Sequence, residues 1–266
     1  MDDEAYARYV AEQLRGCVYL DGSMKYSDLR TSTITYDPLA GTVTSSANDF
    51  SSGDVGKHIA YKTASGYESG RFIITGYVSA TKVNVDVLQT PKAMYGVALN
   101  VWASWYKSFS TLGGLSQYNG QVVGVVADGG YLASYTISGG TLSLDRQITS
   151  VVVGLQYTGM IKSMCLGFSL QGNNTQTTLK NIVRAGMRLV ASAGGRVGSN
   201  LYNLEAVQTR SQRDLNYLPP LPIDGTKYVD YSDDSEEDKF FYIVQDQPLP
   251  FKIACVALEA NYAVST

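Results

Sequence analysis

Short alternating runs separated by glycine turns fill Gly114–Ser163, and this pattern restricts the fold more than any other feature of the chain. Val122–Ala127 is rich in valine, and it is followed by Asp128-Gly129. Asp-Gly favours a type I′ hairpin turn, because both residues tolerate the positive φ that this turn requires. In Tyr131–Ser138, alternate side chains are expected to face opposite sides of a strand. The segment therefore predicts antiparallel hairpins.

Strand patterns also flank this segment on both sides. The chain has 20 tyrosines and 26 glycines, and tyrosine, β-branched residues and turn glycines together favour strands. We therefore predict an all-β fold of two or more antiparallel β-sandwich or barrel-like modules, with one short N-terminal helix. The other expected strands are Ile34–Tyr36, Thr42–Thr44, Ile59–Lys62, Phe72–Val78, Val83–Leu88, Thr141–Leu144, Val151–Val153, Phe240–Val244 and Phe251–Ala257.

The expected organisation has three parts. Residues 1–16 hold the helix, over Asp2–Leu14, where early acidic residues suit the positive end of the helix dipole and Gly16 follows the end. Residues 17–112 form a first β-module that ends in an aromatic linker containing Trp102 and Trp105. Residues 113–266 form a second β-module, interrupted at 218–238 by a proline-rich and acidic loop.

Several motifs occur in a fixed order along most of the chain. They read VYLDGSMKY, GLSQYNGQVVGVVADGG, TISGGTLSL, VVVGLQYTG, KNIVRAGMRLVASAGGRVG and QDQPLPFKI. In this order they resemble the tail tubular protein B family, or tail nozzle proteins, of short-tailed bacteriophages. The family's chains are usually longer, so the resemblance implies a fragment or a shortened relative.

The resemblance implies a structural virion protein, a subunit of a tail tube or nozzle ring through which DNA passes. It further implies a homo-oligomeric ring, sixfold by family resemblance, that contacts other tail or adaptor proteins and, transiently, phage DNA during ejection. The expected location is the virion tail, after assembly in the host cytoplasm. The cysteines Cys17, Cys165 and Cys255 fit that reducing compartment as free thiols.

The chain offers few residues for catalysis. His58 is the only histidine, so any histidine-dependent relay would have to pass through it, and no phosphate-binding GxxxxGK[ST] motif occurs. We expect no enzyme activity, no cofactor and no metal. The acidic run Asp230–Asp238 has two interpretations, a calcium site or, more simply, a solvated loop.

One ordered basic pattern stands out, formed by Lys180, Arg184 and Arg188. Period two and the central Gly186 favour a strand over Leu179–Ala191, although spacing by four also fits one face of a helix. The stripe is a candidate DNA-channel surface or an inter-subunit contact, and a solvent-facing strand side is the simpler interpretation. The net charge of −3 and the pI of about 5.2 do not favour tight nucleic-acid binding.

Two other functions remain open. The first is a β-sandwich module that binds carbohydrate or a host receptor, since tyrosine and tryptophan rings stack on sugars. The second is a cell-wall hydrolase, for which the sequence contains no motif.

Overall fold

The structure, a computed structural model, describes residues 20–62, 68–90, 101–167, 169–170, 173–174, 178–209, 222–231 and 234–262. Within these residues the only helical segments are two short 3-10 turns, Ser52–Asp54 and Ser116–Tyr118, and all other regular elements are strands. The prediction of an all-β fold is therefore confirmed. The expected helix Asp2–Leu14 lies outside the described residues. The chain divides into two compact units at Leu155/Gln156, and Leu20-Asp21 belongs to the second unit.

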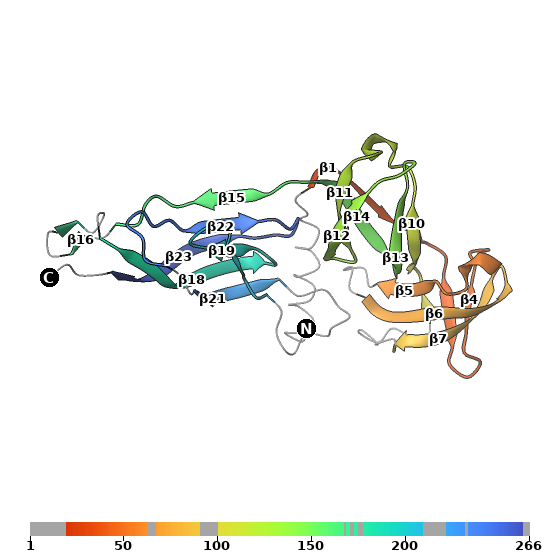
Figure 1. The fold of residues 1–266 in the computed structure, drawn as a ribbon. Helices are drawn as coiled ribbons and strands as arrows, with labels where there is room; N and C mark the ends of the chain where they lie inside the picture. The colour runs from red at the N-terminus through yellow and green to blue at the C-terminus, as the bar shows by residue number, and fades with distance from the viewer. Residues whose placement is uncertain are drawn as a thin grey trace. The chain divides into compact units, whose positions relative to one another are not determined.

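The first unit contains an eight-stranded sheet in the order β2-β9-β5-β6-β7-β4-β3-β8. Its strands β5, β6 and β7 lie side by side in Figure 1. Its aromatic core centres on Trp102 and Trp105, which are both buried. The prediction that Trp102 and Trp105 lie in a linker is thus wrong. Each tryptophan belongs to a strand of this sheet and packs against its core. The strands are β2 (Leu29–Arg30), β3 (Ile34–Asp37), β4 (Thr42–Ser45), β5 (His58–Lys62), β6 (Glu68–Ser79), β7 (Lys82–Gln89), β8 (Val101–Trp102) and β9 (Trp105–Lys107).

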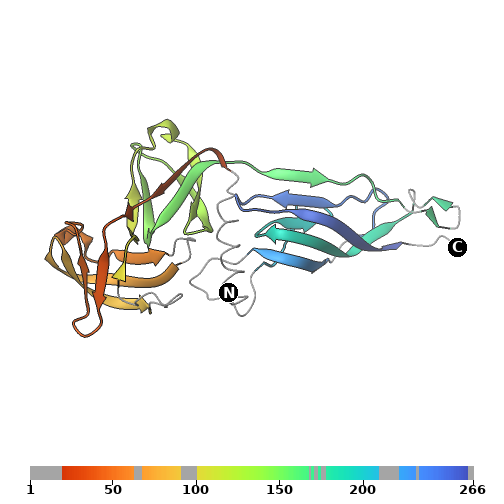
Figure 2. The same ribbon diagram turned by 180° about the vertical axis from the view of Figure 1, so that it is seen from behind.

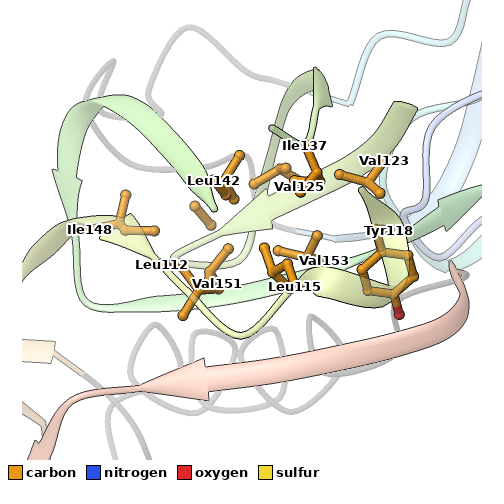
Figure 3. Packing of buried hydrophobic residues seen from close by; sticks show 11 residues of the cluster. Leu112, Leu115, Tyr118, Val123, Val125, Ile137, Leu142, Ile148, Val151 and Val153 are labelled. Carbon is orange, nitrogen blue, oxygen red and sulfur yellow. The ribbon is translucent and has the colours of Figure 1, made fainter. Parts of the chain in front are cut away.

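A second core in the same unit lies between the sheet β1-β14-β11-β12 and the pair β10-β13. Figure 3 shows its aliphatic side chains gathered with Tyr118, whose hydroxyl donates to the backbone oxygen of Gly22. The strands are β1 (Leu20–Ser27), β10 (Phe109–Leu112), β11 (Val122–Ala127), β12 (Gly130–Thr136), β13 (Leu142–Ile148) and β14 (Ser150–Gln156).

The predicted hairpin joins β11 to β12. Ala127 pairs with Gly130, and the two residues between them have positive φ, +48° at Asp128 and +85° at Gly129. These values are those of a type I′ turn, so the sequence interpretation is confirmed. The predicted alternation in β12 holds only in part, because a β-bulge at Leu132 shifts the register between Val125 and Val126 of β11.

The second unit contains the sheets β15-β22-β19-β20 and β21-β18-β23, which share one core, and the small pair β16-β17 (Figures 1 and 2). The strand interpretation of Leu179–Ala191 is confirmed, since β18 covers nearly all of it. The strands are β15 (Gly159–Lys162), β16 (Ser169–Leu170), β17 (Asn173–Asn174), β18 (Lys180–Ser192), β19 (Arg196–Gly198), β20 (Glu205–Ala206), β21 (Ile223–Asp230), β22 (Tyr242–Gln245) and β23 (Ile253–Tyr262).

The observed organisation differs from the expected one in two ways. The expected second module, 113–266, contains two separate cores, because each strand after Gln156 pairs with another strand from that part of the chain. The expected loop at 218–238 contains the strand β21, in which partly buried and exposed residues alternate and Val229 reaches the core. Pairing with β18 over Arg184–Leu189 satisfies the backbone of β21 and explains why this polar sequence is a strand.

Candidate functional site: the outer face of the β21-β18-β23 sheet

A β-bulge divides the predicted basic stripe. In the ladder between β18 and β23, Ile182 pairs with Ala260 and Arg184 with Glu259, so Val183 is an extra residue. Burial changes at this point: Ile182 lies in the core, whereas Arg184 and Arg188 are exposed. A bulge of one residue reverses which face the following side chains occupy. The structure therefore keeps Arg184 and Arg188 on one outer face and separates Lys180 from them.

Lys180 is buried, with 1% of its surface exposed, and its Nζ donates to the backbone oxygen of Thr178 at 3.2 Å. A second buried lysine, Lys239, donates to the backbone oxygen of Asp234 at 2.8 Å and pairs with Glu236 Oε2 at 3.3 Å. The backbones of Lys180 and Glu236 are also joined by two hydrogen bonds. Within the described part of the acidic run, the ammonium group of Lys239 thus lies against oxygen atoms of Asp234 and Glu236.

Three strands form the outer face, and their side chains lie in rows across the sheet. The acidic row consists of Asp230, Arg184 and Glu259, in register on β21, β18 and β23. Arg184 Nε lies 2.5 Å from Asp230 Oδ1, and Arg184 Nη1 lies 4.0 Å from Glu259 Oε2. The hydrogen bond to Asp230 raises the pKa of the Arg184 guanidinium above its ordinary value. Two carboxylates around one guanidinium leave this row with a formal charge of −1.

The aromatic row consists of Tyr228, Gly186 and Ala257. A Cβ atom added to Gly186 would lie 2.9 Å from Tyr228 Cε1, so the ring covers the glycine directly. Tyr228 is nevertheless 68% exposed, and the guanidinium carbon of Arg184 lies 6.0 Å from its ring centroid. The row presents a flat apolar surface at the middle of the face.

The basic row consists of Thr226, Arg188 and Cys255. Within the described part of the chain, no carboxylate lies within ion-pair distance of Arg188, so this row carries a formal charge of +1. The nearby Asp224 instead accepts a hydrogen bond from the backbone nitrogen of Ala191. Across the three rows two arginines are balanced by two carboxylates, and Asp224, which is exposed on the same face of β21, adds a third carboxylate beside the basic row.

His58, the only histidine, lies at the start of β5 and is half-buried. Its backbone nitrogen donates to Ser108 Oγ at 2.6 Å, and its Nδ1 is 3.5 Å from Arg71 Nη1. Arg71 Nη2 in turn lies 3.7 Å from Asp128 Oδ2. Asp128 accepts hydrogen bonds from Thr149 and Ser150, so its carboxylate fixes the turn between β13 and β14. The contacts of His58 are those of a residue that holds neighbouring strands together.

Among the described residues of the first unit, the most strongly buried carboxylate belongs to Asp54, which is 2% exposed. Burial raises its pKa, but hydrogen bonds from Lys57, Lys107 and the Ser51 backbone outweigh that effect and lower the pKa to about 2. Lys57 Nζ lies 2.7 Å and Lys107 Nζ 3.0 Å from its two oxygens. Asp54 therefore stays ionised and joins the 3-10 turn to β9.

Sequence reasoning missed the aromatic row. Its only signal was a tyrosine and a glycine on strands that are distant in sequence, and nothing local pairs Tyr228 with Gly186.

Among the residues that the structure describes, no group of three or more His, Cys, Asp or Glu side chains could hold a metal ion. Those same residues also include no helix long and apolar enough to cross a bilayer. Comparisons with protein-family models and with curated proteins return no match.

Proposed function

We propose that the chain is a structural virion protein, a subunit of a phage tail tube or nozzle ring through which DNA passes. The observation that carries the proposal is the order of the motifs that resemble the tail nozzle family. Each of the principal motifs coincides with a strand and its turn. VVGVVADGG covers β11 and the type I′ turn, VVVGLQ covers most of β14, and KNIVRAGMRLVASAGGRVG covers β18, a glycine turn and β19. A sequence pattern spread over both units thus corresponds to strands and turns of the structure.

The electrostatics of the outer face also favour the proposal. DNA must slide through a nozzle, and strong contacts between basic residues and phosphates would slow it. Arg184 is paired with two carboxylates on the outer face and Lys180 is buried away from it, so Arg188 supplies the remaining positive charge of the stripe. Such a surface suits either a channel wall with weak DNA contact or a contact between subunits.

Cryo-electron microscopy of the parent virion tests the proposal. We expect density for this chain around the tail axis with cyclic symmetry, in a heterologous ring whose contacts repeat from subunit to subunit. Density on the capsid surface, or absence of the chain from purified particles, would overturn it.

The proposal also excludes catalysis. A single general base typically contributes 10²-fold or more to a reaction rate. His58→Ala should therefore leave particle infectivity within about a few-fold of the unmodified phage.

One observation favours a second candidate, a module that binds carbohydrate or a host receptor. Tyr228 presents an exposed ring beside Arg184, and an aromatic face with an adjacent hydrogen-bond donor suits a sugar ring. A glycan array separates the two functions. Saturable binding to one glycan class that is lost in Tyr228→Ala would support the binding module, and no binding to any glycan would exclude it.

A further inference from the structure

We propose that Ser108 latches two β-modules of the first unit into one fixed orientation. The sheet module is the eight-stranded sheet with its aromatic core, and the sandwich module consists of β1-β14-β11-β12 and β10-β13. The latch is the hydrogen bond from the Ser108 hydroxyl to Gln147 of β13. Without this bond, the modules turn about the two points where the chain passes between them. The proposal concerns the first unit alone and does not depend on the proposed function.

The two modules have separate apolar cores. In the described part of the unit, no residue belongs to both clusters, whether buried or half-buried against the core. Burial of apolar surface is the main force that holds elements together, and here it acts within each module. The orientation of one module relative to the other therefore depends on the chain crossings and on polar contacts between the modules.

The chain passes between the modules at two adjacent points. After Asp28, the chain goes from β1 of the sandwich module to β2 of the sheet module. At Ser108 it returns from β9 of the sheet module to β10 of the sandwich module. The backbone nitrogen of Lys107 donates to the backbone oxygen of Asp28 at 3.0 Å, so the crossings lie side by side. A few residues at the ends of elements are the usual site of a hinge.

The hydroxyl of Ser108 bonds to both modules at once. Ser108 is 1% exposed, and its Oγ accepts a hydrogen bond from the backbone nitrogen of His58 in β5 at 2.6 Å. The same hydroxyl donates to Gln147 Oε1 in β13 at 2.8 Å. A serine hydroxyl has one donor and two acceptor lone pairs, so it makes both bonds together. The backbone nitrogen of Ser108 also donates to the backbone oxygen of His58, which fixes the serine on the sheet module.

An ion pair between the modules is weaker than this bond. Arg71 Nη2 of β6 lies 3.7 Å from Asp128 Oδ2, which is too long for a hydrogen bond. Both side chains are about one-fifth exposed, and ion pairs that remain in contact with water contribute little. The oxygen atoms of Asp128 are already bonded to Thr149 and Ser150 within the sandwich module. The bond from Ser108 to Gln147 therefore determines the orientation.

Replacing the acceptor tests the latch without disturbing the buried serine. Gln147→Leu removes the acceptor at a half-buried position and leaves the bond between His58 and Ser108 in place. Gln147→Glu is the matched control, because a carboxylate oxygen also accepts a hydrogen bond from a hydroxyl. Spin labels report the orientation when the three native cysteines are replaced by serine. One label is placed at Leu39, between β3 and β4, and the other at Ala133 of β12, both exposed.

The measurement is the distribution of distances between the two labels, by double electron–electron resonance on the full chain. The wild type and Gln147→Glu should each give one narrow distribution. Gln147→Leu should give one at least about twofold wider, because released modules populate an ensemble of orientations. Circular dichroism verifies that each protein is folded.

Three results would overturn the latch. The first is a Gln147→Leu distribution as narrow as that of the wild type, and the second is a wild-type distribution as wide as that of Gln147→Leu. The third is a Gln147→Glu distribution as wide as that of Gln147→Leu, since the acceptor would then not be the cause of the fixed orientation.

Discussion

Gly186 of β18 lies directly beneath the ring of Tyr228 of β21, at a distance that leaves no room for a side chain on the glycine. The glycine weakens the strand, because it has no side chain to pack and loses more backbone entropy on folding. The ring compensates by covering the exposed backbone. This pair explains how a glycine is kept at the centre of a long strand.

The first prediction is an energetic coupling between these two residues. Tyr228→Ala should lower the free energy of unfolding by about 0.2–1 kcal/mol, the range of a favourable cross-strand pair. In a Gly186→Ala background the ring is already displaced, so the same substitution should have a smaller effect. Urea unfolding of the four proteins of this double-mutant cycle measures the coupling. An equal effect of Tyr228→Ala in both backgrounds would show that the contact contributes nothing.

The second prediction concerns the tip of the β11-β12 hairpin. Gly129 has φ +85°, where a β-branched residue is strained. Gly129→Val should therefore destabilise the fold by roughly 1–2 kcal/mol. The matched control is Gly113→Val in the same unit, since Gly113 does not have positive φ and has open space around a new Cβ. Thermal unfolding should separate the two variants, and a similar loss in both would refute the role of the turn.

The third prediction is a pH dependence that arises from Asp54. Its pKa of about 2 lies below the value of about 3.9 for an unfolded aspartate, so ionised Asp54 stabilises the folded protein. That stabilisation is fully present above about pH 4 and is lost as the pH falls through about 2. At neutral pH, Asp54→Asn leaves Lys107 without its buried counter-charge, which should lower stability by about 3 kcal/mol or more.

Urea unfolding of the wild type and Asp54→Asn across this pH range tests the dependence. The difference between the two proteins should be largest at pH 7 and shrink toward pH 2. Asp86→Asn is the control, because Asp86 is an exposed carboxylate on β7 and surface substitutions usually change stability by less than about 0.5 kcal/mol. A difference that stays constant with pH would mean that the charge of Asp54 does not contribute.

The fourth prediction concerns the buried ammonium group of Lys239. It holds the backbone of Asp234 and the carboxylate of Glu236, so Lys239→Ala should release this segment. Cleavage by a glutamate-specific endoprotease at Glu236 and Glu237 should then be faster than in the wild type, because proteolysis requires local opening of the chain. Lys252→Ala, at an exposed lysine of the same unit, should be cleaved at the wild-type rate. Unchanged cleavage of Lys239→Ala would show that the lysine does not restrain the segment.

Local chemistry determined much of this fold. Asp128-Gly129 specified a hairpin turn because few residues accept positive φ, and the valine-rich run before it was sufficient to define β11. Alternation with a central glycine identified β18 as a strand rather than a helix. These features depend only on residues that are neighbours in the sequence, so the sequence alone is sufficient to predict them.

Tertiary structure alone decided the composition of the candidate site. The extra residue at Val183 reverses the faces of β18, and this bulge depends on the register of β23, more than 70 residues away. For that reason a stripe that looks continuous in sequence becomes two exposed arginines and a buried lysine. The pairing of Tyr228 with Gly186 and the placement of Trp102 and Trp105 in a core likewise require strands that are distant in sequence to meet. Period and turn chemistry predict strands, but only the pairing of those strands determines which side chains share a face.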